Sequence, residues 1–523
     1  MKSIIQCLQQ KSNGLLESPT GTGKTLCILC ATLGWLDHKR LDSLRQLVDT
    51  NGKQLLSSAT KTLNGWQLKD QMPQILYSSR THSQLSQACK ELKRTSYKSF
   101  KSVVIGSREQ LCINPDVTKL DTMSAKNQTC RYKTARNMCQ YYRNYEQKVE
   151  RSLEYSAGQV FDIEDLVRFG KSNTCCPYYA AHYIQKSASL VFMPYNYVLD
   201  PNIRHRNKLD VKHSVVIFDE GHNIERMCEE SVSTELRSHS FAVVIKYMDQ
   251  LLEKLRDLNE NKYEGSDDKE LSELDVVAVV KLKNFVCDLE MAMDSMVKSE
   301  KSLKITHQTP VIFSILEKAG LEVQTIQALM KTMDELVMLI TSSGESGSPQ
   351  GMAMSAAFNS LKEFVEKLIP IGVTTAEAYQ SHKEDFIKKY KIFSEKGVEA
   401  EDDKTNFWNK QSSPDSWILH VWCMSPSVGA KALLDLGIHN MVITSGTLAP
   451  INSFEAEMDI KFNVKLQNNH IIGDNQLSII NICQSRDKVV LTSKYDNRDN
   501  MEYYRALGQT LIEILRAVPK GVL

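Results

Sequence analysis

Residues 18–25, SPTGTGKT, combine small residues with a lysine and a threonine at a spacing that can hold nucleotide phosphates. Glycines let backbone N–H groups turn toward phosphate oxygens, and a helix N-terminus behind them favours negative charge. We expect Lys24 to act as a catalytic residue on the β- and γ-phosphates and the Thr25 hydroxyl to bind Mg²⁺. The common pattern begins with glycine where this chain has Ser18, but its second half, from Gly21 to Thr25, is intact. The predicted phosphate loop comprises Ser18, Pro19, Thr20, Gly21, Thr22, Gly23, Lys24 and Thr25.

A pair of carboxylates ends the apolar run of residues 215–223, VVIFDEGHN. At the end of a buried strand, Asp219 is expected to bind Mg²⁺ through water and Glu220 to orient or deprotonate an attacking water. His222 is expected to couple this pair to a polynucleotide track. The usual form is DEAH, whereas the third residue here is Gly221. Alone, such a pair is more often a solvated turn; together with the phosphate loop it indicates nucleoside triphosphate hydrolysis.

Four cysteines form a candidate metal site, with 17, 8 and 36 residues between successive members. Four thiolates suit either a 4Fe–4S cluster or a structural Zn²⁺. Zinc sites commonly pair cysteines about two to four residues apart, and this set shows no such pair. Because Cys175 and Cys176 are adjacent, only one of them is expected to be a ligand. Four unrelated buried thiols explain the spacing about as well. The candidates are Cys112, Cys130, Cys139 and Cys176.

A basic segment lies between Cys89 and Arg151, where fourteen Lys and Arg residues accompany six Asp and Glu residues. Its balance is therefore +8, although the whole chain carries only +1. Basic side chains beside stacking aromatic rings are what a single strand of nucleic acid requires. A solvated basic face is the alternative explanation. The interleaved aromatic residues are Tyr97, Phe100, Tyr132, Tyr141, Tyr142 and Tyr145.

Short apolar runs separated by helices must position these residues. An apolar helix is expected at 25–36, and strands alternating with helices predict an α/β fold with a parallel, doubly wound sheet. Ligands bind at the carboxyl ends of the strands in such sheets. SSRTHSQL (78–85) and ITSGTLAP (443–450) place hydroxyl groups there. The strand candidates are residues 13–18, 74–79, 215–218 and 441–445.

The strand candidates lie far apart in a chain of 523 residues, so other units must be inserted between them. The first insertion, about 101–190, is rich in cysteine and basic residues. The second, about 232–415, is expected to be mostly helical, because 241–258 and 320–340 show amphipathic helical periodicity. A hydrophobic fraction of 42% and a charged fraction of 24% are typical of globular proteins. No apolar run approaches the roughly 18 residues of a membrane span, so no membrane partner is expected.

Seven blocks resemble the iron–sulfur DNA helicases of superfamily 2, in particular the branch that acts at telomeres. The resemblance covers nearly the whole chain and is weakest from about 235 to 410. It implies a nuclear, ATP-dependent DNA helicase of 5′-to-3′ polarity that acts in telomere maintenance, DNA repair and control of recombination. The implied cofactors are ATP, Mg²⁺ and a 4Fe–4S cluster. The blocks are GLLESPTGTGKTLCILC, SSRTHSQL, GSREQLC, TCCPYY, FMPYNYVLD, VVIFDEGHNIERMCEES and VITSGTLAPINSFEAEM.

The resemblance also implies an architecture: a RecA-like P-loop motor domain with an inserted iron–sulfur domain and an inserted, mainly helical arch. Its cluster ligands map onto the four cysteines above, with Cys176 as the cysteine before Pro-Tyr-Tyr, and this favours the cluster over zinc. We expect His222, Ser445, Gly446 and Thr447 to complete the nucleotide site, and Arg80, Thr81 and His82 to contact DNA. The expected boundaries are 1–100, 191–231 and 416–485 for the first motor domain, 101–190 for the iron–sulfur domain, 232–415 for the arch and 486–523 for the start of a second motor domain.

A helicase of this type needs that second motor domain, whose arginines stabilise charge on the transferred phosphoryl group. The chain ends at RAVPKGVL, and Met1 lies only 17 residues before Ser18, where the family has an adenine-reading segment. We therefore expect a monomeric N-terminal half that binds single-stranded DNA and single/double-strand junctions, hydrolyses ATP slowly and does not unwind. The alternatives are a non-catalytic DNA-binding or interaction module and a zinc-stabilised nucleoside triphosphatase acting on another substrate.

Overall fold

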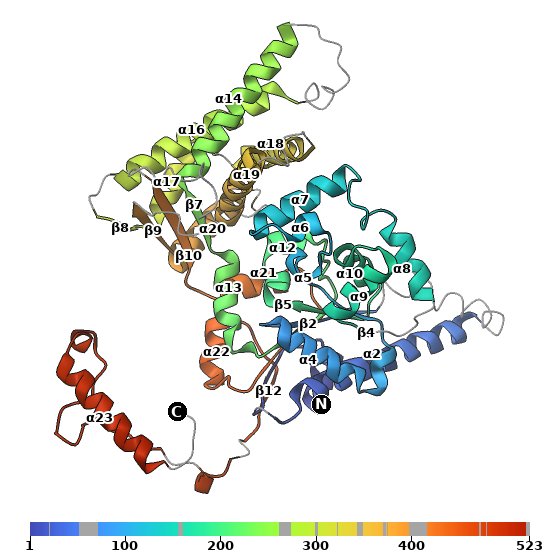
Figure 1. The fold of residues 1–523 in the computed structure, drawn as a ribbon, viewed down its shortest axis with the longest axis vertical. Helices are drawn as coiled ribbons and strands as arrows, with labels where there is room; N and C mark the ends of the chain where they lie inside the picture. The colour runs from blue at the N-terminus through green and yellow to red at the C-terminus, as the bar shows by residue number, and fades with distance from the viewer. Residues whose placement is uncertain are drawn as a thin grey trace. The chain divides into compact units, whose positions relative to one another are not determined.

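The chain folds into two compact units, Met1–Asn468 and Asn469–Leu523, drawn in Figure 1. Thr20, which the sequence assigns to the phosphate loop, lies outside the described residues. The computed structural model describes residues 1–19, 21–51, 72–154, 160–260, 274–298, 302–321, 323–342, 349–369, 373, 375–396, 416–469, 472–476 and 479–518.

An eight-stranded sheet organises the first unit, in the order β12-β1-β11-β6-β2-β5-β3-β4. Every neighbouring pair in it is parallel. Because strands distant in sequence alternate across the sheet, the predicted doubly wound α/β architecture is confirmed. The strands are β1 (Gly14–Glu17), β2 (Ile75–Ser79), β3 (Ser102–Val104), β4 (Val160–Phe161), β5 (Leu190–Pro194), β6 (Val215–Asp219), β11 (Asn440–Ser445) and β12 (Val464–Gln467).

Helices cover both faces of this sheet, so its inner strands are buried on both sides. Successive strand residues point to opposite faces: Leu76 packs into one apolar core, while Ile75 and Tyr77 pack into the other. This explains why the strands are continuous apolar runs rather than alternating ones. On one face lie α1 (Lys2–Gln10), α2 (Lys24–Asn51) and α4 (His82–Lys93). On the other lie α10 (Pro177–Gln185), α11 (Tyr195–Leu199), α13 (Ile224–Val232), α21 (Ser427–Leu434) and α22 (Ile451–Met458). In Figure 1, α2 and α4 lie below β2 and β4, and α10 lies above them.

The first insertion consists of short helices whose ends are fixed by side-chain caps. Asn114 accepts from the N–H of Asp116 at 3.0 Å, and Thr122 from that of Ala125 at 3.2 Å. Such caps satisfy backbone donors that a short helix leaves unpaired. Strands β3 and β4 fall inside the range expected for this insertion, yet they belong to the main sheet. The helices are α5 (Arg108–Leu111), α6 (Pro115–Thr118), α7 (Met123–Ala135), α8 (Tyr145–Glu154) and α9 (Ile163–Asn173); α12 (Pro201–Arg206) follows β5.

The second insertion has a hydrophobic core of its own, formed by residues between Leu236 and Cys423. Its helices are α14 (Ser238–Glu260), α16 (Val276–Lys298), α17 (Pro310–Lys318), α18 (Val323–Ser342), α19 (Pro349–Leu368) and α20 (Ala376–Lys389). The helical periodicity at 241–258 and 320–340 predicted α14 and α18. A four-stranded antiparallel sheet, which that periodicity did not anticipate, joins them in the order β7-β10-β9-β8. Its strands are β7 (Thr234–Arg237), β8 (Lys304–His307), β9 (Tyr390–Lys396) and β10 (Trp417–Cys423).

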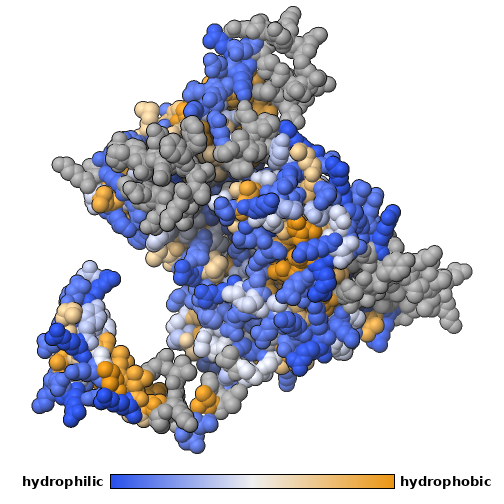
Figure 2. Space-filling model, in the orientation of Figure 1, coloured by the Kyte–Doolittle hydropathy of each residue, from blue (hydrophilic) through white to orange (hydrophobic). Residues whose placement is uncertain are grey.

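The second unit contains the amphipathic helix α23 (Met501–Ala517), preceded by short 3₁₀ turns at Asp474–Gln476 and Tyr495–Asn497. The hydroxyls of Ser493 and Tyr503 lie 2.8 Å apart and join the helix to the segment before it. Figure 2 shows hydrophobic residues on the visible face of this helix. Exposed apolar residues on it are Met501, Tyr504, Leu511, Ile512 and Leu515. None of the helices in the described part of the chain is both long and apolar enough to span a lipid bilayer.

Candidate functional site

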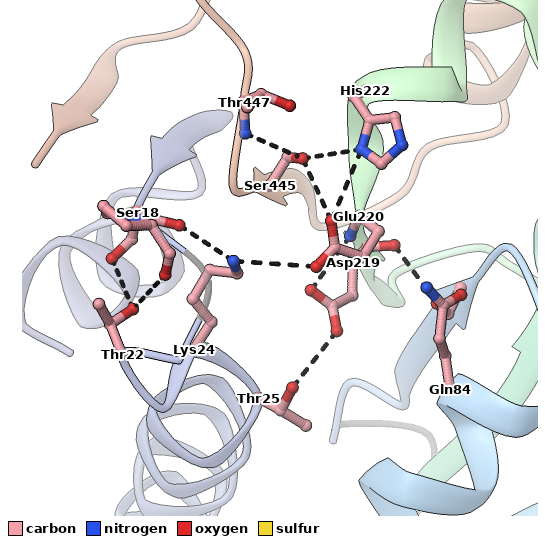
Figure 3. A network of polar contacts seen from close by, with 12 residues as sticks. Ser18, Thr22, Lys24, Thr25, Gln84, Asp219, Glu220, His222, Ser445 and Thr447 are labelled. Atoms are coloured by element: carbon pink, nitrogen blue, oxygen red, sulfur yellow. Dashed lines mark hydrogen bonds and ion pairs between the residues drawn. The ribbon is translucent and has the colours of Figure 1, made fainter. Parts of the chain in front are cut away.

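Three loops converge where the neighbouring strands β1, β11 and β6 end. They are the phosphate loop after β1, the Asp-Glu pair that ends β6, and the loop 445–450 after β11 (Figure 3). Parallel strands carry their carboxyl ends to one edge of a sheet, and this is where such folds bind ligands. Segments that are more than 200 residues apart in sequence therefore form one site.

The phosphate loop has the backbone conformation that a phosphate cradle needs. Gly21 and Gly23 have φ angles of 81° and 74°, a left-handed region that side chains with a Cβ rarely adopt. Helix α2 begins at Lys24, directly after these glycines. The N-terminus of a 28-residue helix thus points at the loop, and its unpaired N–H groups and partial positive charge favour an anion there.

Ser18 stands at the position usually held by glycine, and its hydroxyl forms hydrogen bonds that hold the loop. It lies 2.9 Å from the hydroxyl of Thr22, which donates to the carbonyl of Pro19 at 2.8 Å. Asn468 also donates to the Ser18 hydroxyl at 3.2 Å. The ammonium of Lys24 donates to the Ser18 carbonyl at 3.0 Å. The residue that departs from the common pattern is therefore part of the loop's own hydrogen-bond network.

Asp219 is the buried carboxylate of the site, with only 6% of its surface exposed. The Thr25 hydroxyl lies 3.5 Å from its Oδ2, and its Oδ1 accepts from the N–H of Glu220 at 3.1 Å. Burial raises the pKa of the Asp219 carboxyl, and the charge of Glu220 raises it further. Glu220 Oε1 lies 3.8 Å from the ammonium of Lys24. Carboxylate and hydroxyl oxygens are the donors that Mg²⁺ prefers, so Thr25 and Asp219 fit the role expected of them.

Two buried tyrosines that the sequence reasoning missed hold Asp219 in place. The hydroxyl of Tyr77 donates to Asp219 Oδ2, and that of Tyr195 donates to the Asp219 main-chain carbonyl. Ser79 reaches the same carbonyl at 3.4 Å. A tyrosine in the middle of the apolar run ILYSS was the available signal, because a buried hydroxyl costs free energy unless it finds a partner.

The hydroxyl of Ser445 connects the Asp-Glu pair to the loop 445–450. It lies 3.0 Å from Nδ1 of His222 and donates to Oε2 of Glu220 at 3.4 Å. It also accepts from the N–H of Thr447 at 3.4 Å. Gly446 lies between these two residues and is half-buried. The four residues expected to complete the nucleotide site are thus brought to its rim (Figure 3).

Glu17 connects the phosphate loop to the loop 445–450. The sequence reasoning did not identify this residue either. Its Oε1 accepts from the N–H of Leu448 at 3.2 Å, and the N–H of Ser18 donates to the carbonyl of Ser445 at 3.0 Å. Glu17 ends β1 directly before the phosphate loop. The two loops are therefore held to each other at two points.

The three residues expected to contact DNA follow β2 but differ in their surroundings. Arg80 is exposed. Thr81 is the N-cap of α4 and forms a capping box with Gln84, so its hydroxyl has a structural partner. His82 is half-buried, and burial lowers its pKa. Arg80 and Thr81 are thus the exposed residues of the three, and Thr81 is engaged in the cap of α4.

The four candidate cysteines meet at one cavity of the first insertion. They come from the ends of α5 and α10, from α7 and from the loop after it. The rest of the lining is Ile113, Asn114, Val117, Lys133, Thr134 and Tyr141. Asn114 donates to the sulfur of Cys139 at 3.4 Å, and the N–H of Cys176 donates to the Tyr141 carbonyl at 2.7 Å. Cys175 is directed elsewhere, with its thiol 3.8 Å from the carbonyl of Tyr145. The cysteines that line the cavity are Cys112, Cys130, Cys139 and Cys176.

Burial and neighbouring thiols change the pKa of two cysteines of this set. Burial raises the pKa of Cys112 and of Cys176, and the other cysteines of the set raise both further. Within the described ranges, no group of three or more His, Cys, Asp or Glu side chains has the geometry of a bound metal ion. The cavity therefore gathers four free thiols without the close convergence of a single-ion site.

Comparison with known proteins places the chain among helicase sequences. Residues 77–241 match the DEAD_2 family model, and residues 243–426 match the model described as RTEL1 helicase, ARCH domain. The whole chain is 36% identical to Regulator of telomere elongation helicase 1 of Rattus norvegicus, covering 42% of it, and 34% identical to the homolog of Anopheles gambiae, covering 54%. A solved structure titled XPD_Helicase is similar over 98% of this chain and 68% of its own, with 15% identity and a TM-score of 0.48. The chain spans about half the length of the curated relatives it matches.

Proposed function

The chain belongs to the superfamily 2 helicases related to the regulator of telomere elongation helicase, and we propose that it forms the half of such a motor that binds ATP, Mg²⁺ and DNA. The observation that carries the proposal is the convergence of Lys24, Thr25, Asp219 and Glu220 at one edge of the parallel sheet. Each of these side chains suits one task of phosphoryl transfer, and the contacts between them support this assignment of tasks.

In this proposal the ammonium of Lys24 holds the β- and γ-phosphates, within the cradle that Gly21 and Gly23 open. Thr25 and Asp219 hold the metal ion, which when bound neutralises charge on the phosphate oxygens. Glu220, half-buried and adjacent to Asp219, orients or deprotonates the attacking water. Ser445 and His222, which contact Glu220, link this chemistry to the DNA track.

We further propose that the four cysteines hold a 4Fe–4S cluster. Three buried thiols and the half-buried thiol of Cys112 line one cavity, and this supports a group that all four could ligate. When bound, the cluster supplies four iron–sulfur bonds that cross-link α5, α7 and α10. The basic segment that carries three of these cysteines, Cys112, Cys130 and Cys139, then contacts single-stranded DNA or a single/double-strand junction.

The finer features of the function follow from family membership and are proposals for this chain. We propose 5′-to-3′ polarity, action in telomere maintenance, DNA repair and control of recombination, and a nuclear location. They rest on the names of the relatives and on the motif blocks of this chain.

Binding of a fluorescent ATP analogue to residues 1–523 tests the nucleotide site. Lys24→Ala should weaken binding in Mg²⁺ by about 10- to 100-fold, because a charge-assisted contact to phosphate contributes roughly 1.5–3 kcal/mol. Glu220→Gln should bind as the parent does but lose whatever ATP hydrolysis the parent shows. Equal binding by Lys24→Ala and the parent would contradict the proposal. Nucleotide and DNA binding with no hydrolysis above background would instead identify a non-catalytic binding module.

A further inference from the structure

Two buried tyrosines donate hydrogen bonds to the same aspartate, Asp219, but to different parts of it. Tyr77 donates to the carboxylate, and Tyr195 to the main-chain carbonyl. We propose that Tyr77 is a positioning residue that fixes the Asp219 carboxylate toward the metal ion, whereas Tyr195 supports only the backbone. This inference rests on the proposed nucleotide site and adds to it the residue that sets its metal dependence.

The contacts of the Asp219 carboxylate show how the Tyr77 hydroxyl fixes its orientation. Oδ1 accepts from the N–H of Glu220 at 3.1 Å, while Oδ2 accepts from Tyr77 and lies 3.5 Å from the hydroxyl of Thr25. Both oxygens are therefore held, and rotation of the carboxylate would break one of these bonds. Oδ2, the oxygen nearest to the other expected metal-binding group, is the one that Tyr77 fixes.

The position of Tyr77 in the fold supports a role beyond packing. It lies in the middle of β2, beside Ile217 of β6, and has no exposed surface. Its ring packs against Phe192 at a centroid distance of 5.3 Å, a contact that phenylalanine would make equally well. What the hydroxyl adds is a hydrogen bond to a charged group across 142 positions of the sequence. A hydroxyl in such an apolar core is costly to bury without a partner, so its value lies in the contact with Asp219.

Tyr195 offers a matched control. It is 2% exposed, packs against Phe218 at 5.5 Å, and also donates to Asp219. Tyr195→Phe therefore removes one buried hydroxyl and one hydrogen bond to the same residue, as Tyr77→Phe does. The two variants differ in whether the carboxylate loses its donor.

The experiment measures binding of a fluorescent ADP analogue to residues 1–523 over a Mg²⁺ series and in EDTA. Tyr77→Phe should need about tenfold more Mg²⁺ for half-maximal enhancement of binding, the size expected for a lost hydrogen bond to a charged group. Its binding in EDTA should equal that of the parent, because the phosphate loop is untouched. Tyr195→Phe should follow the Mg²⁺ series of the parent, while its melting temperature falls by an amount similar to that of Tyr77→Phe.

A double-mutant cycle shows whether Tyr77 acts through Asp219. In an Asp219→Asn background, adding Tyr77→Phe should cause no further change in the Mg²⁺ series, since the carboxylate that Tyr77 positions is absent. Equal Mg²⁺ dependence of Tyr77→Phe and the parent would overturn the inference, as would equal shifts in the two phenylalanine variants. Absence of any Mg²⁺-enhanced binding by the parent would instead overturn the proposed nucleotide site itself.

Discussion

A Cβ atom on Gly221 would lie 2.4 Å from Cγ2 of Ile443, a buried residue of β11. This close approach explains why the third residue of the box is glycine where the usual form has alanine. The backbone is also constrained one residue earlier, where Glu220 has a φ of 61°. A non-glycine residue in that region costs roughly 1–3 kcal/mol and persists only where its surroundings hold it. Gly221 therefore lets the turn that carries Glu220 pack directly onto β11.

Gly221→Ala should destabilise the protein by about 1–3 kcal/mol, because a methyl group would be forced into a packed core. The decrease would appear as a lower melting temperature. Ile443→Leu moves the branch from the β to the γ carbon, so adding it to Gly221→Ala should recover part of the loss. If Gly221→Ala melted at the temperature of the parent, the contact with Ile443 would not account for the glycine.

At the scale of elements, the cysteine cavity depends on pieces that are too short to be stable alone. Helices α5 and α6 have four residues each, and isolated helices shorter than about 12–15 residues are marginal in water. Asn114 caps the N-terminus of α6. Each helix buries one apolar side chain, Leu111 in α5 and Val117 in α6. A cross-link at the four cysteines would therefore stabilise α5 directly, because Cys112 follows it, and would hold the cavity wall to which α6 contributes Val117.

Replacing Cys139 by serine should remove the broad visible absorption and the bound iron of the purified protein and increase hydrogen exchange in α6 and α7. The cause would be loss of the proposed cross-link while the caps remain. Cys175→Ser is the matched control, since its neighbour Cys176 lines the cavity and Cys175 does not. Colourless parent protein containing zinc would argue against the cluster and for a structural zinc site.

At the scale of the whole molecule, charge is concentrated on one stretch of sequence. The basic segment has a balance of +8 in a chain of net charge +1, so the remainder is acidic by about the same amount. Exposed cations of this segment include Lys119 and Arg136, and the Arg136 guanidinium lies over the ring of Tyr132 at 4.8 Å. A cation beside an aromatic ring suits both the phosphate and the base of a single strand.

The double variant Lys119→Gln, Arg136→Gln should bind single-stranded DNA more weakly than the parent, and its affinity should fall less steeply with salt. Each lost phosphate contact lowers the slope of log affinity against log salt by about 0.7 for a single strand. Lys281→Gln with Lys388→Gln removes the same charge from exposed positions of the second insertion and should leave the slope unchanged. Equal slopes in the two double variants would mean that the basic segment does not set DNA binding.

The sequence alone was sufficient to predict features that depend on residues close together in the chain. The phosphate loop follows from glycines that must adopt positive φ directly before a helix, and β1, β2, β6 and β11 follow from apolar runs of strand length. The parallel sheet follows from the alternation of those runs with helices. For α14 and α18, the amphipathic periodicity was enough, because a helix packs through residues three and four positions apart.

Tertiary structure decided what depends on residues distant in the chain. The antiparallel sheet of the second insertion pairs β7 with β10, about 180 positions apart, and no local period encodes that pairing. The bond from Tyr77 to Asp219 and the approach of Ile443 to Gly221 are likewise invisible in spacing. Residue types and short spacings determined which chemistry this chain carries; packing between remote segments determined which side chains hold that chemistry in place, because burial and contact are properties of the folded chain.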